Sequence, residues 1–340
     1  MKAIVLSGSG DSKDVFNLQD TETPTPGENQ VRIKVSHFGL NYADIMARKG
    51  LYNDRPPLPC VLGYEVVGEI TEVGAKVTGF AVGDYVLAFS QFGGYAEYCV
   101  TEAMGTIKLA PGTNPEEACA LATQYCTAWF AAAMMINLQK GDRVLIHAAA
   151  GGVGTALVQI AKWKGCEIFG TAGNTEKLEY LKSLGVDHAI NYRTSDFLEA
   201  VKNGLGSNRL DAAFDPVGGA NFKKSLHLLG SGGRIVTFGA SEWSASKGRF
   251  IDKLKLAFGF GFLHPIGLLM KSRAVIGVNM LRIGENRPDY LKTCMEDVYD
   301  LYQKGILKPK IDSVYEATEI EAAHARLEGR GSIGKVVMKW

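Results

Sequence analysis

Short runs of alternating apolar and polar residues, broken by Gly and Pro, characterise the chain up to residue 110. Four of these runs are residues 30–36, 66–73, 84–89 and 95–100. A period of two is typical of strands that bury one face. The pattern therefore predicts a small, irregular antiparallel β domain. The N-terminus begins with an apolar run that is too short for a secretory signal and is interpreted as a first strand.

After Pro115 the pattern changes to an Ala-rich helical segment, residues 116–136, and then to apolar strands that alternate with helices. Such alternation predicts an α/β fold with a doubly wound parallel sheet of six strands. A tail follows, with an amphipathic helix at 288–304 and a last segment, 313–340, whose end resembles a strand that returns to the first domain. We therefore expect domains at 1–122 and 123–282, with 283–340 completing the first. The expected strands of the sheet begin near Val144 and cover residues 166–171, 188–192, 210–215, 234–239 and 274–279.

Composition excludes several classes of protein. The chain has 340 residues, enough for two ordinary domains. Its 37 Lys and Arg balance 36 Asp and Glu, so no positive field is available to hold nucleic acid. The six cysteines include no C-x-x-C pair, which disfavours a disulfide framework and indicates reduced thiols in a cytoplasmic protein. The most apolar stretch, 254–270, is interrupted and too short to span a membrane.

A glycine-rich turn joins the apolar strand near Val144 to a helix expected at 153–164. Against the pattern G-x-G-x-x-G, the residues Ala149 to Gly154 lack only the first glycine. A turn of this kind lets backbone N–H groups and the helix N-terminus approach a pyrophosphate. The following strand completes a β-α-β unit, so a dinucleotide site is predicted.

The residue that selects the cofactor is expected about 20 positions beyond the glycines, where NAD-binding proteins carry Asp or Glu. Gly173 lies there instead, and Lys177 follows one helical turn later. A lysine can pair with a 2'-phosphate, so the sequence favours NADP(H). The plain alternative is that Gly173 is a loop residue and Lys177 a solvated charge.

Several motifs together resemble the zinc-independent quinone oxidoreductase branch of the medium-chain dehydrogenase/reductase superfamily. They are residues 38–44, 57–65, 82–86, 148–154, 215–219 and 334–337. Within that branch, residues 46–52 and a Phe-rich insert before Asn279 look most like the vesicle amine transport protein group. The resemblance implies a GroES-like β domain beside the nucleotide sheet. It also implies a homodimer that pairs through the edges of the nucleotide sheets.

Zinc enzymes of this layout use a Cys near residue 41, a His near residue 64 and a four-cysteine lobe near residue 100. This chain has Asn41 and Tyr64 at the first two places, and Cys99 has no companion at lobe spacing. An amide and a phenol do not replace a thiolate and an imidazole as zinc ligands, so we expect no zinc. Without a Lewis acid, hydride transfer from NADPH to a quinone or an α,β-unsaturated carbonyl is favoured over alcohol oxidation.

The candidate catalytic residues follow from the resemblance and from their donor groups. Asn41 and Tyr42 are expected to donate to the nicotinamide ribose or the substrate oxygen, Asp44 to orient them, and Tyr52 to act as a second donor. The structural alternatives are that Asn41 caps a helix beginning near Ala43 and that Tyr52 only packs. The final proton is expected to come from solvent. His147 and Asp215 are interpreted as structural, since each ends a buried strand.

The resemblance also implies a set of cofactor-binding residues. Tyr192 and Arg330 within it have plain alternatives as a core aromatic residue and a surface charge. With Asn41, the set is Thr127, Gly151, Gly152, Val153, Gly173, Lys177, Tyr192, Phe238, Gly239, Ala240, Ser241, Asn279, Met280, Leu281 and Arg330.

The segment 247–273 is long, basic at its start and rich in Phe and Gly. It is interpreted as a lid over an apolar substrate, a dimer interface or a patch that contacts a membrane surface, with the first two favoured.

Two other functions stay open. One is a nucleotide-binding protein of low turnover that uses this insert to bind a partner or membrane. The other is an enoyl thioester reductase, which predicts a basic groove that the sequence does not reveal.

Overall fold

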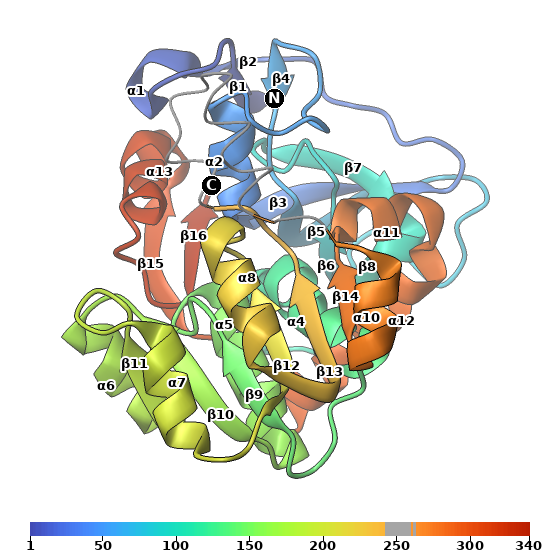
Figure 1. Ribbon diagram of the computed structural model, residues 1–340. Helices are drawn as coiled ribbons and strands as arrows, with labels where there is room; N and C mark the ends of the chain where they lie inside the picture. Colours follow the sequence, from blue (N-terminus) through green and yellow to red (C-terminus); the bar gives the residue numbers. More distant parts are fainter. Residues whose placement is uncertain (242–259, 261–262) are drawn as a thin grey trace. The chain divides into compact units, whose positions relative to one another are not determined.

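The computed structural model describes residues 1–241, 260 and 263–340 (Figure 1). The chain divides into two compact units. Unit 1 consists of Met1–Cys126 and Met280–Trp340, and unit 2 consists of Thr127–Asn279. Most of the insert predicted at 247–273 lies outside the described residues.

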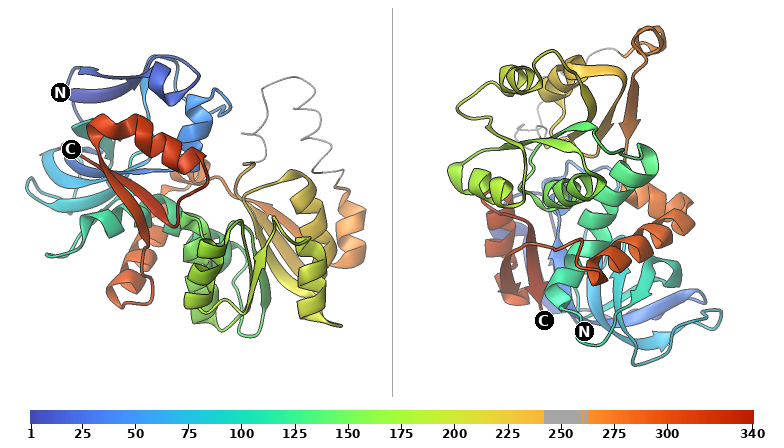
Figure 2. Two further views of the ribbon diagram at one scale, coloured as in Figure 1. Left: turned by 90° about the vertical axis from the view of Figure 1, so that its left-hand side faces the viewer. Right: turned by 90° about the horizontal axis from the view of Figure 1, so that it is seen from below.

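Unit 2 contains a parallel sheet of six strands among its described residues, in the order β11-β10-β9-β12-β13-β14. The order reverses between β9 and β12. Because parallel crossovers are right-handed, this reversal sends α5 and α6 to one face and the following helices to the other, as Figure 2 shows. The predicted doubly wound α/β fold is confirmed. The elements are β9 (Arg143–Ile146), α5 (Gly152–Lys164), β10 (Glu167–Ala172), α6 (Thr175–Ser183), β11 (His188–Asn191), α7 (Phe197–Leu205), β12 (Leu210–Asp215), α8 (Gly219–Leu228), β13 (Leu229–Thr237), α10 (Pro265–Lys271) and β14 (Ala274–Gly277).

Unit 1 is a β structure whose strands pair antiparallel, except that β15 (Ile311–Glu316) runs parallel to β16 (Lys335–Lys339). Strand β3 alternates buried Val31, Ile33 and Val35 with more exposed residues, which is the predicted period of two. Strand β16 pairs with β3, so the C-terminal segment completes this sheet. The larger sheet contains β3 (Gln30–Leu40), β5 (Glu65–Val73), β6 (Tyr85–Phe89), β7 (Tyr98–Glu102), β8 (Thr106–Lys108), β15 (Ile311–Glu316) and β16 (Lys335–Lys339), and the smaller one β1 (Lys2–Leu6), β2 (Phe16–Asp20) and β4 (Cys60–Val61).

Helices pack against the larger sheet, among them α3, α12 and α13. The predicted amphipathic helix at 288–304 is α12, with Leu291, Met295 and Val298 buried on one face. The helices of unit 1 include α1 (Ser12–Val15), α2 (Tyr42–Arg48), α3 (Pro115–Ala120), α11 (Met280–Asn286), α12 (Pro288–Gln303) and α13 (Ile320–Glu328).

The helical segment predicted at 116–136 is present without a break from Pro115 to Met135, but it is not a regular α-helix. After α3, the chain makes a π-helical turn at Leu121–Tyr125, a short α4 at Cys126–Trp129 and a second π-helical stretch at Phe130–Met135. Within the first π turn, the Thr123 N–H donates to the Glu65 carboxylate at 2.8 Å. A helix turn whose N–H group binds a side chain departs from the regular α pattern, which composition alone does not reveal.

All six cysteines are free and buried, as the sequence predicted. In the part of the chain that the structure describes, no helix combines the length and apolar character needed to cross a bilayer.

Candidate active site

Asn41 lies at the junction between β3 and α2 in unit 1. It occupies the N-cap position of α2, and its backbone N–H donates to Asp44 Oδ2 at 2.8 Å. This hydrogen bond is half of a capping box, so the capping position considered for Asn41 is the one it holds. Its side chain, however, makes its hydrogen bonds elsewhere.

The Asn41 amide lies between two buried charged side chains. Lys335 Nζ donates to Asn41 Oδ1 at 2.9 Å, and Asn41 Nδ2 donates to Glu65 Oε1 at 2.8 Å. Lys335 and Glu65 also form a direct ion pair, and neither side chain is exposed. We call Asn41, Glu65 and Lys335 the buried amide cluster.

The two charges determine which way the Asn41 amide faces. An ammonium has only donors and therefore requires the amide oxygen. A carboxylate has only acceptors and therefore requires the amide nitrogen. The cluster thus fixes the amide orientation and leaves the second Nδ2–H as the remaining donor of Asn41.

Gly39 makes room for the buried amide cluster. A Cβ atom at this position would overlap Glu65 Oε1 and the Lys335 side chain. A side chain there would therefore separate the pair, which gives a physical reason for glycine in the motif at residues 38–44.

Asp44 is fully buried behind Asn41. Burial raises the pKa of this carboxyl from 3.8 to about 7, although the Asn41 N–H and Lys335 oppose the rise. The Tyr95 hydroxyl lies nearby and binds His324 Nε2 at 3.2 Å. Asp44 therefore carries a proton over part of the neutral pH range.

Tyr52 and Tyr64 lie next to each other in the same unit. Their ring centroids are 6.4 Å apart in an edge-to-face arrangement, and Tyr64 packs against Phe92 at 5.1 Å. Tyr64 is 3% exposed and Tyr52 is half-buried. Burial raises the pKa of both hydroxyls, so each remains a hydrogen-bond donor at neutral pH. Tyr42 is half-buried in the first turn of α2.

Asn41 and Tyr64 occupy the two places where zinc relatives would carry Cys and His. Asn41 is engaged by Lys335 and Glu65, while Tyr64 presents a phenol. Within residues 1–241, 260 and 263–340, no three His, Cys, Asp or Glu side chains are grouped to hold a metal ion.

The glycine-rich turn in unit 2 leads directly into α5, with Gly151 as its N-cap. A Cβ on Gly154 would overlap the Ala148 carbonyl oxygen, so the third glycine allows close packing of helix and strand. Ala148 itself has φ of 50°, a left-handed conformation that tightens the turn. The N–H groups at the start of α5 are thus arranged as a phosphate site requires.

The selectivity position, Gly173, is surrounded by polar groups. A Cβ atom there would lie 2.7 Å from the Tyr192 hydroxyl and 3.4 Å from Arg193 Nε. A side chain at this position would therefore require the exposed Tyr192 ring to move. Lys177 lies in the first turn of α6, where its N–H binds the Asn174 side chain at 2.9 Å. Tyr192 and Arg193 thus lie beside Gly173, and Lys177 follows in the next helix.

The remaining predicted cofactor residues are divided between the units. Thr127 is buried and Phe238 to Ser241 follow β13, all in unit 2 with Asn279. Met280 and Leu281 begin α11 in unit 1 and are buried. Arg330 follows α13 with φ of 55° and is exposed.

His147 and Asp215 end neighbouring strands and are held by local hydrogen bonds. His147 bonds to Thr171 Oγ1 at 3.2 Å and Ser225 Oγ at 2.8 Å. Asp215 Oδ1 accepts the N–H groups of Val217 and Gly218. These partners agree with structural roles.

Four residues with functional potential were missing from the predicted site. Glu65, Lys335 and Tyr64 belong to the motifs that carry the resemblance, and Arg193 lies outside those motifs. Two of these residues can be recognised in the sequence. Lys335 is a charged residue in an otherwise apolar strand, and Arg193 is a basic residue shortly after the strand that pairs with the one leading to Gly173.

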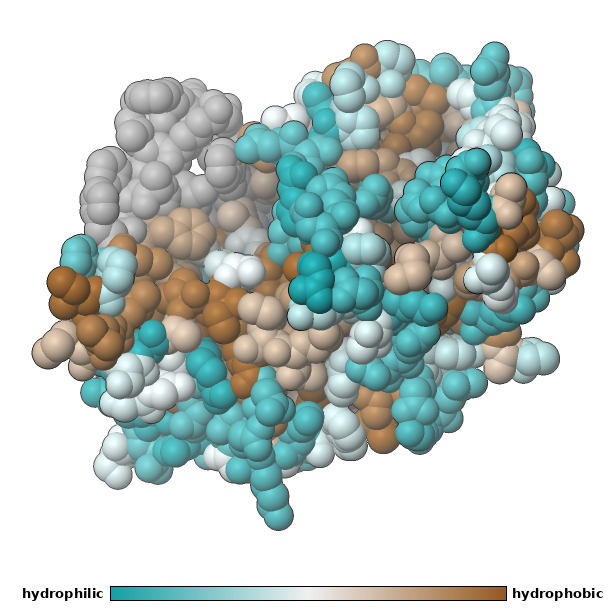
Figure 3. Space-filling view, turned by 90° about the vertical axis from the view of Figure 1, so that its right-hand side faces the viewer, coloured by the Kyte–Doolittle hydropathy of each residue, from teal (hydrophilic) through white to brown (hydrophobic). Residues whose placement is uncertain are grey.

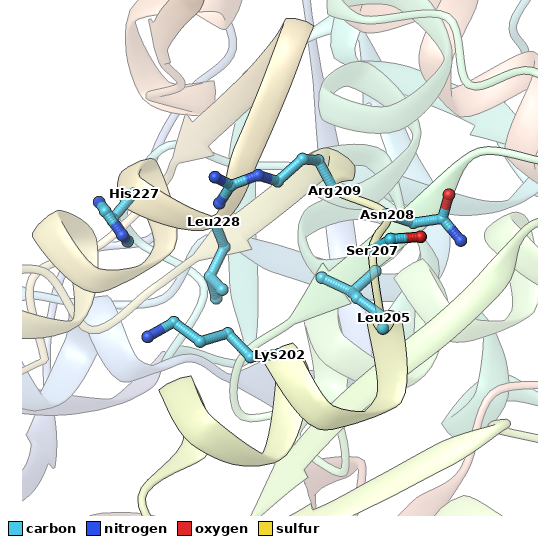
Figure 4. A pocket seen from close by; sticks show the side chains of 8 residues that line it. Lys202, Leu205, Ser207, Asn208, Arg209, His227 and Leu228 are labelled. Atoms are coloured by element: carbon cyan, nitrogen blue, oxygen red, sulfur yellow. The ribbon is translucent and has the colours of Figure 1, made fainter.

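A pocket of about 320 Å³ lies at the C-terminal ends of α7 and α8 (Figure 4). The side chains of Lys202, Arg209 and His227 surround Leu228, while Ser207 and Asn208 point the other way. Lys202 is in the last turn of α7, where a cation balances the helix dipole. The charge of Lys202 is thus explained without a ligand.

Comparison with known proteins agrees with both units. Residues 27–129 match the alcohol dehydrogenase GroES-like domain family, and residues 152–296 match the zinc-binding dehydrogenase family. The chain is 33% identical over 342 residues to the synaptic vesicle membrane protein VAT-1 homolog of Homo sapiens, covering 99% of this chain and 86% of that protein. It is 29% identical over 340 residues to the quinone oxidoreductase of Homo sapiens, covering 99% of this chain and 97% of that protein.

A solved structure extends the likeness to three dimensions. The quinone oxidoreductase of Escherichia coli, crystallised with NADPH, superposes with a TM-score of 0.88 at 26% identity and covers 100% of both chains. The protein is therefore an NAD(P)-dependent oxidoreductase of the quinone oxidoreductase-like kind. It belongs to the medium-chain dehydrogenase/reductase superfamily, in the group that contains the quinone oxidoreductases and the VAT-1 homologues.

Proposed function

We propose that the protein is an NADPH-dependent, zinc-free reductase of quinones or α,β-unsaturated carbonyls. The observation that carries the proposal is the buried amide cluster. A fixed cation, Lys335, and a fixed carboxylate, Glu65, orient an amide where zinc relatives need a thiolate. The amide presents a hydrogen-bond donor, which suits an acceptor that spreads incoming charge onto its own oxygen.

The cofactor proposal rests on the turn before α5 and on the surroundings of Gly173. Gly151, Gly152 and Val153 would hold the pyrophosphate at the helix N-terminus. Tyr192, Lys177 and Arg193 would bind the 2'-phosphate. The absence of a carboxylate at position 173, and the presence of Tyr192 and Arg193 beside it, support NADPH over NADH.

When bound, the reduced nicotinamide supplies a hydride to the acceptor. The chain contributes donors that stabilise the negative charge on the acceptor oxygen. Asn41, Tyr42 and Tyr52 are the proposed donors, with Asp44 holding the backbone of Asn41. Each such donor is worth about 2–4 kcal/mol when its target charge develops in the transition state.

We also propose a homodimer paired through the edge of the nucleotide sheet. Strand β14 ends that sheet among the described residues, and the preceding helix α10 buries none of its own residues. Ile266, Leu269 and Met270 are 61%, 76% and 78% exposed. Figure 3 shows that apolar side chains gather over part of the face that it draws. An apolar helix beside an open strand edge supports a protein contact there.

The six free, buried thiols support a cytoplasmic location.

The experiment that tests the function is oxidation of NADPH and NADH with a panel of quinones and enones. We expect turnover with NADPH, a clear preference over NADH, and no dependence on added zinc. NADPH binding without oxidation of any acceptor would favour the alternative of a low-turnover nucleotide-binding protein. Turnover restricted to enoyl thioesters would favour the enoyl reductase alternative.

A further inference from the structure

Tyr52 begins a tight turn of unit 1 that is held from two sides. The turn ends at Arg55, whose N–H donates to the Tyr52 carbonyl oxygen at 3.2 Å. On one side, the Arg55 guanidinium donates to Ser9 Oγ at 2.7 Å and to the Ala47 carbonyl oxygen at 3.0 Å. These two contacts join the turn to the segment after β1 and to the end of α2.

Asp54 joins the other side of the turn to α11. Its carboxylate pairs with the Arg282 guanidinium, although 228 positions separate the two residues in the chain. A second terminal nitrogen of Arg282 donates to Glu285 Oε2 at 2.7 Å, one helical turn further along α11. The donors of a guanidinium lie in one rigid plane, so the bond to Glu285 helps to fix the direction of the bond to Asp54.

The Asp54–Arg282 pair lies at the surface of unit 1. The Arg282 side chain is 55% exposed and the Asp54 side chain is 19% exposed. An exposed ion pair adds little to the stability of a fold, and salt weakens it further. The pair is therefore poorly suited to stabilise the whole unit, but it can determine where a short turn lies.

The turn carries one of the donors of the proposed function. The Tyr52 ring packs against the core of unit 1 and meets the Tyr64 ring edge to face, with centroids 6.4 Å apart. At the other end of the ion pair, α11 begins with Met280 and Leu281, which are expected beside the cofactor. The pair thus joins a segment expected at the nicotinamide to the turn that carries an expected donor to the acceptor.

We propose that Arg282 is a positioning residue for the acceptor. It holds the turn through Asp54, so that the Tyr52 hydroxyl keeps its place at the acceptor oxygen. Under the proposed reductase function, on which this role rests, opening the pair weakens acceptor binding. It leaves NADPH affinity almost unchanged, because the proposed cofactor contacts lie mainly at the turn before α5 and around Gly173.

The first test is hydrogen exchange of residues 50–59, measured by mass spectrometry, which does not require activity. The Arg55 N–H closes the turn and therefore reports on its opening. We expect exchange in this segment to be at least about threefold faster in Arg282→Gln than in the parent. The parent in about 1 M NaCl should approach the variant. Equal exchange in the parent and Arg282→Gln at low salt would overturn the proposal.

The second test is reduction of duroquinone, an uncharged quinone whose fully substituted ring resists addition of thiols. We expect Arg282→Gln to raise the KM for duroquinone about threefold, with the KM for NADPH unchanged. In the parent the KM for duroquinone should rise with salt, and the variant should lose this dependence. Because duroquinone has no charge, steering of the acceptor cannot cause that salt effect. A variant with the parental KM at low salt would refute the role of Arg282.

A double-variant cycle with Tyr52→Phe tests whether Arg282 acts through the Tyr52 hydroxyl. Tyr52→Phe keeps the ring and removes the donor. If Arg282 acts only by placing that donor, Arg282→Gln should change the KM for duroquinone little in the Tyr52→Phe background. An effect of the same size in both backgrounds would contradict the proposed role.

Arg287→Gln is the matched control. Arg287 is also an exposed arginine of unit 1, and it pairs at 2.7 Å with Asp289, two positions away in the same segment. This control should keep the parental exchange of residues 50–59 and the parental KM for duroquinone. If the parent oxidises NADPH with no acceptor, the proposed function fails, whereas hydrogen exchange still decides whether Arg282 holds the turn.

Discussion

Lys335 and Glu65 form an ion pair in which neither side chain reaches solvent, although 270 positions separate them in the chain. The Asn41 amide bridges the two through one hydrogen bond to each. The pair joins the C-terminal strand β16 to the start of β5, and it determines the orientation of the side chain proposed to meet the substrate.

Removing one charge of this pair should strongly destabilise unit 1. Lys335→Met leaves the Glu65 carboxylate buried without its cation, which we expect to cost about 3–5 kcal/mol. Urea unfolding followed by tryptophan fluorescence measures this loss.

A double variant and a control on the same strand make that test specific. Lys335→Met combined with Glu65→Leu removes both charges and should recover most of the stability. Lys339→Met breaks an exposed pair with Glu316 and should change stability little. Equal losses in Lys335→Met and Lys339→Met would contradict a decisive role for burial.

Asp44 predicts a specific pH dependence of stability. Its pKa is about 7 in the folded protein against a usual 3.8, so the folded state binds the proton more tightly than the unfolded state. The stabilisation from this proton is complete below about pH 4 and is lost as pH rises through about 7. Relative to the parent, Asp44→Asn should therefore gain stability between pH 4 and pH 8. A stability difference that does not change with pH would show that Asp44 has an ordinary pKa.

Selectivity for NADPH should depend on the cations near Gly173. Arg193→Gln and Lys177→Gln should each weaken NADPH binding by about tenfold and leave NADH binding almost unchanged, because each removes a charge-assisted hydrogen bond to the 2'-phosphate. Fluorescence titration with each nucleotide measures the change. Arg209→Gln, an exposed arginine of the same unit, is the control and should bind both nucleotides as the parent does.

The proposed dimer depends on the apolar side of α10. Leu269→Glu places a charge on a residue that is 76% exposed in the single chain, so a monomer should tolerate it while a dimer should dissociate. Light scattering after gel filtration gives the mass of each form. A parent that already runs as a monomer, or a variant that stays dimeric, would exclude this interface.

Local patterns predicted the features that local physics determines. The alternation in β3, the glycines before α5 and the missing carboxylate at Gly173 each lie within a short stretch of sequence, so the fold class and the glycine-rich turn could be predicted. The π turn at Leu121–Tyr125 could not, because it accompanies a hydrogen bond from Thr123 to a distant carboxylate.

The buried amide cluster shows why most of the candidate site could not be predicted. Lys335 lies 294 positions from Asn41, and in the sequence it is only a charged residue in an apolar strand. Its role depends on the pairing of β16 with β3, which brings the C-terminal segment beside the start of α2. Likewise, Arg193 gains its significance from the proximity of Gly173 across neighbouring strands.

Deuteride transfer by protein that has been stripped of metal with a chelator tests most directly whether NADPH gives its hydride to the acceptor without a metal ion. The protein would be mixed with NADPH deuterated at the reactive carbon and with a quinone or an enone, and the reduced product of the enone would be examined for deuterium. We expect NADPH oxidation with both acceptors, deuterium in the enone product, and rates unchanged by added zinc. Activity that vanishes on chelation and returns with zinc, or a product without deuterium, would contradict this expectation.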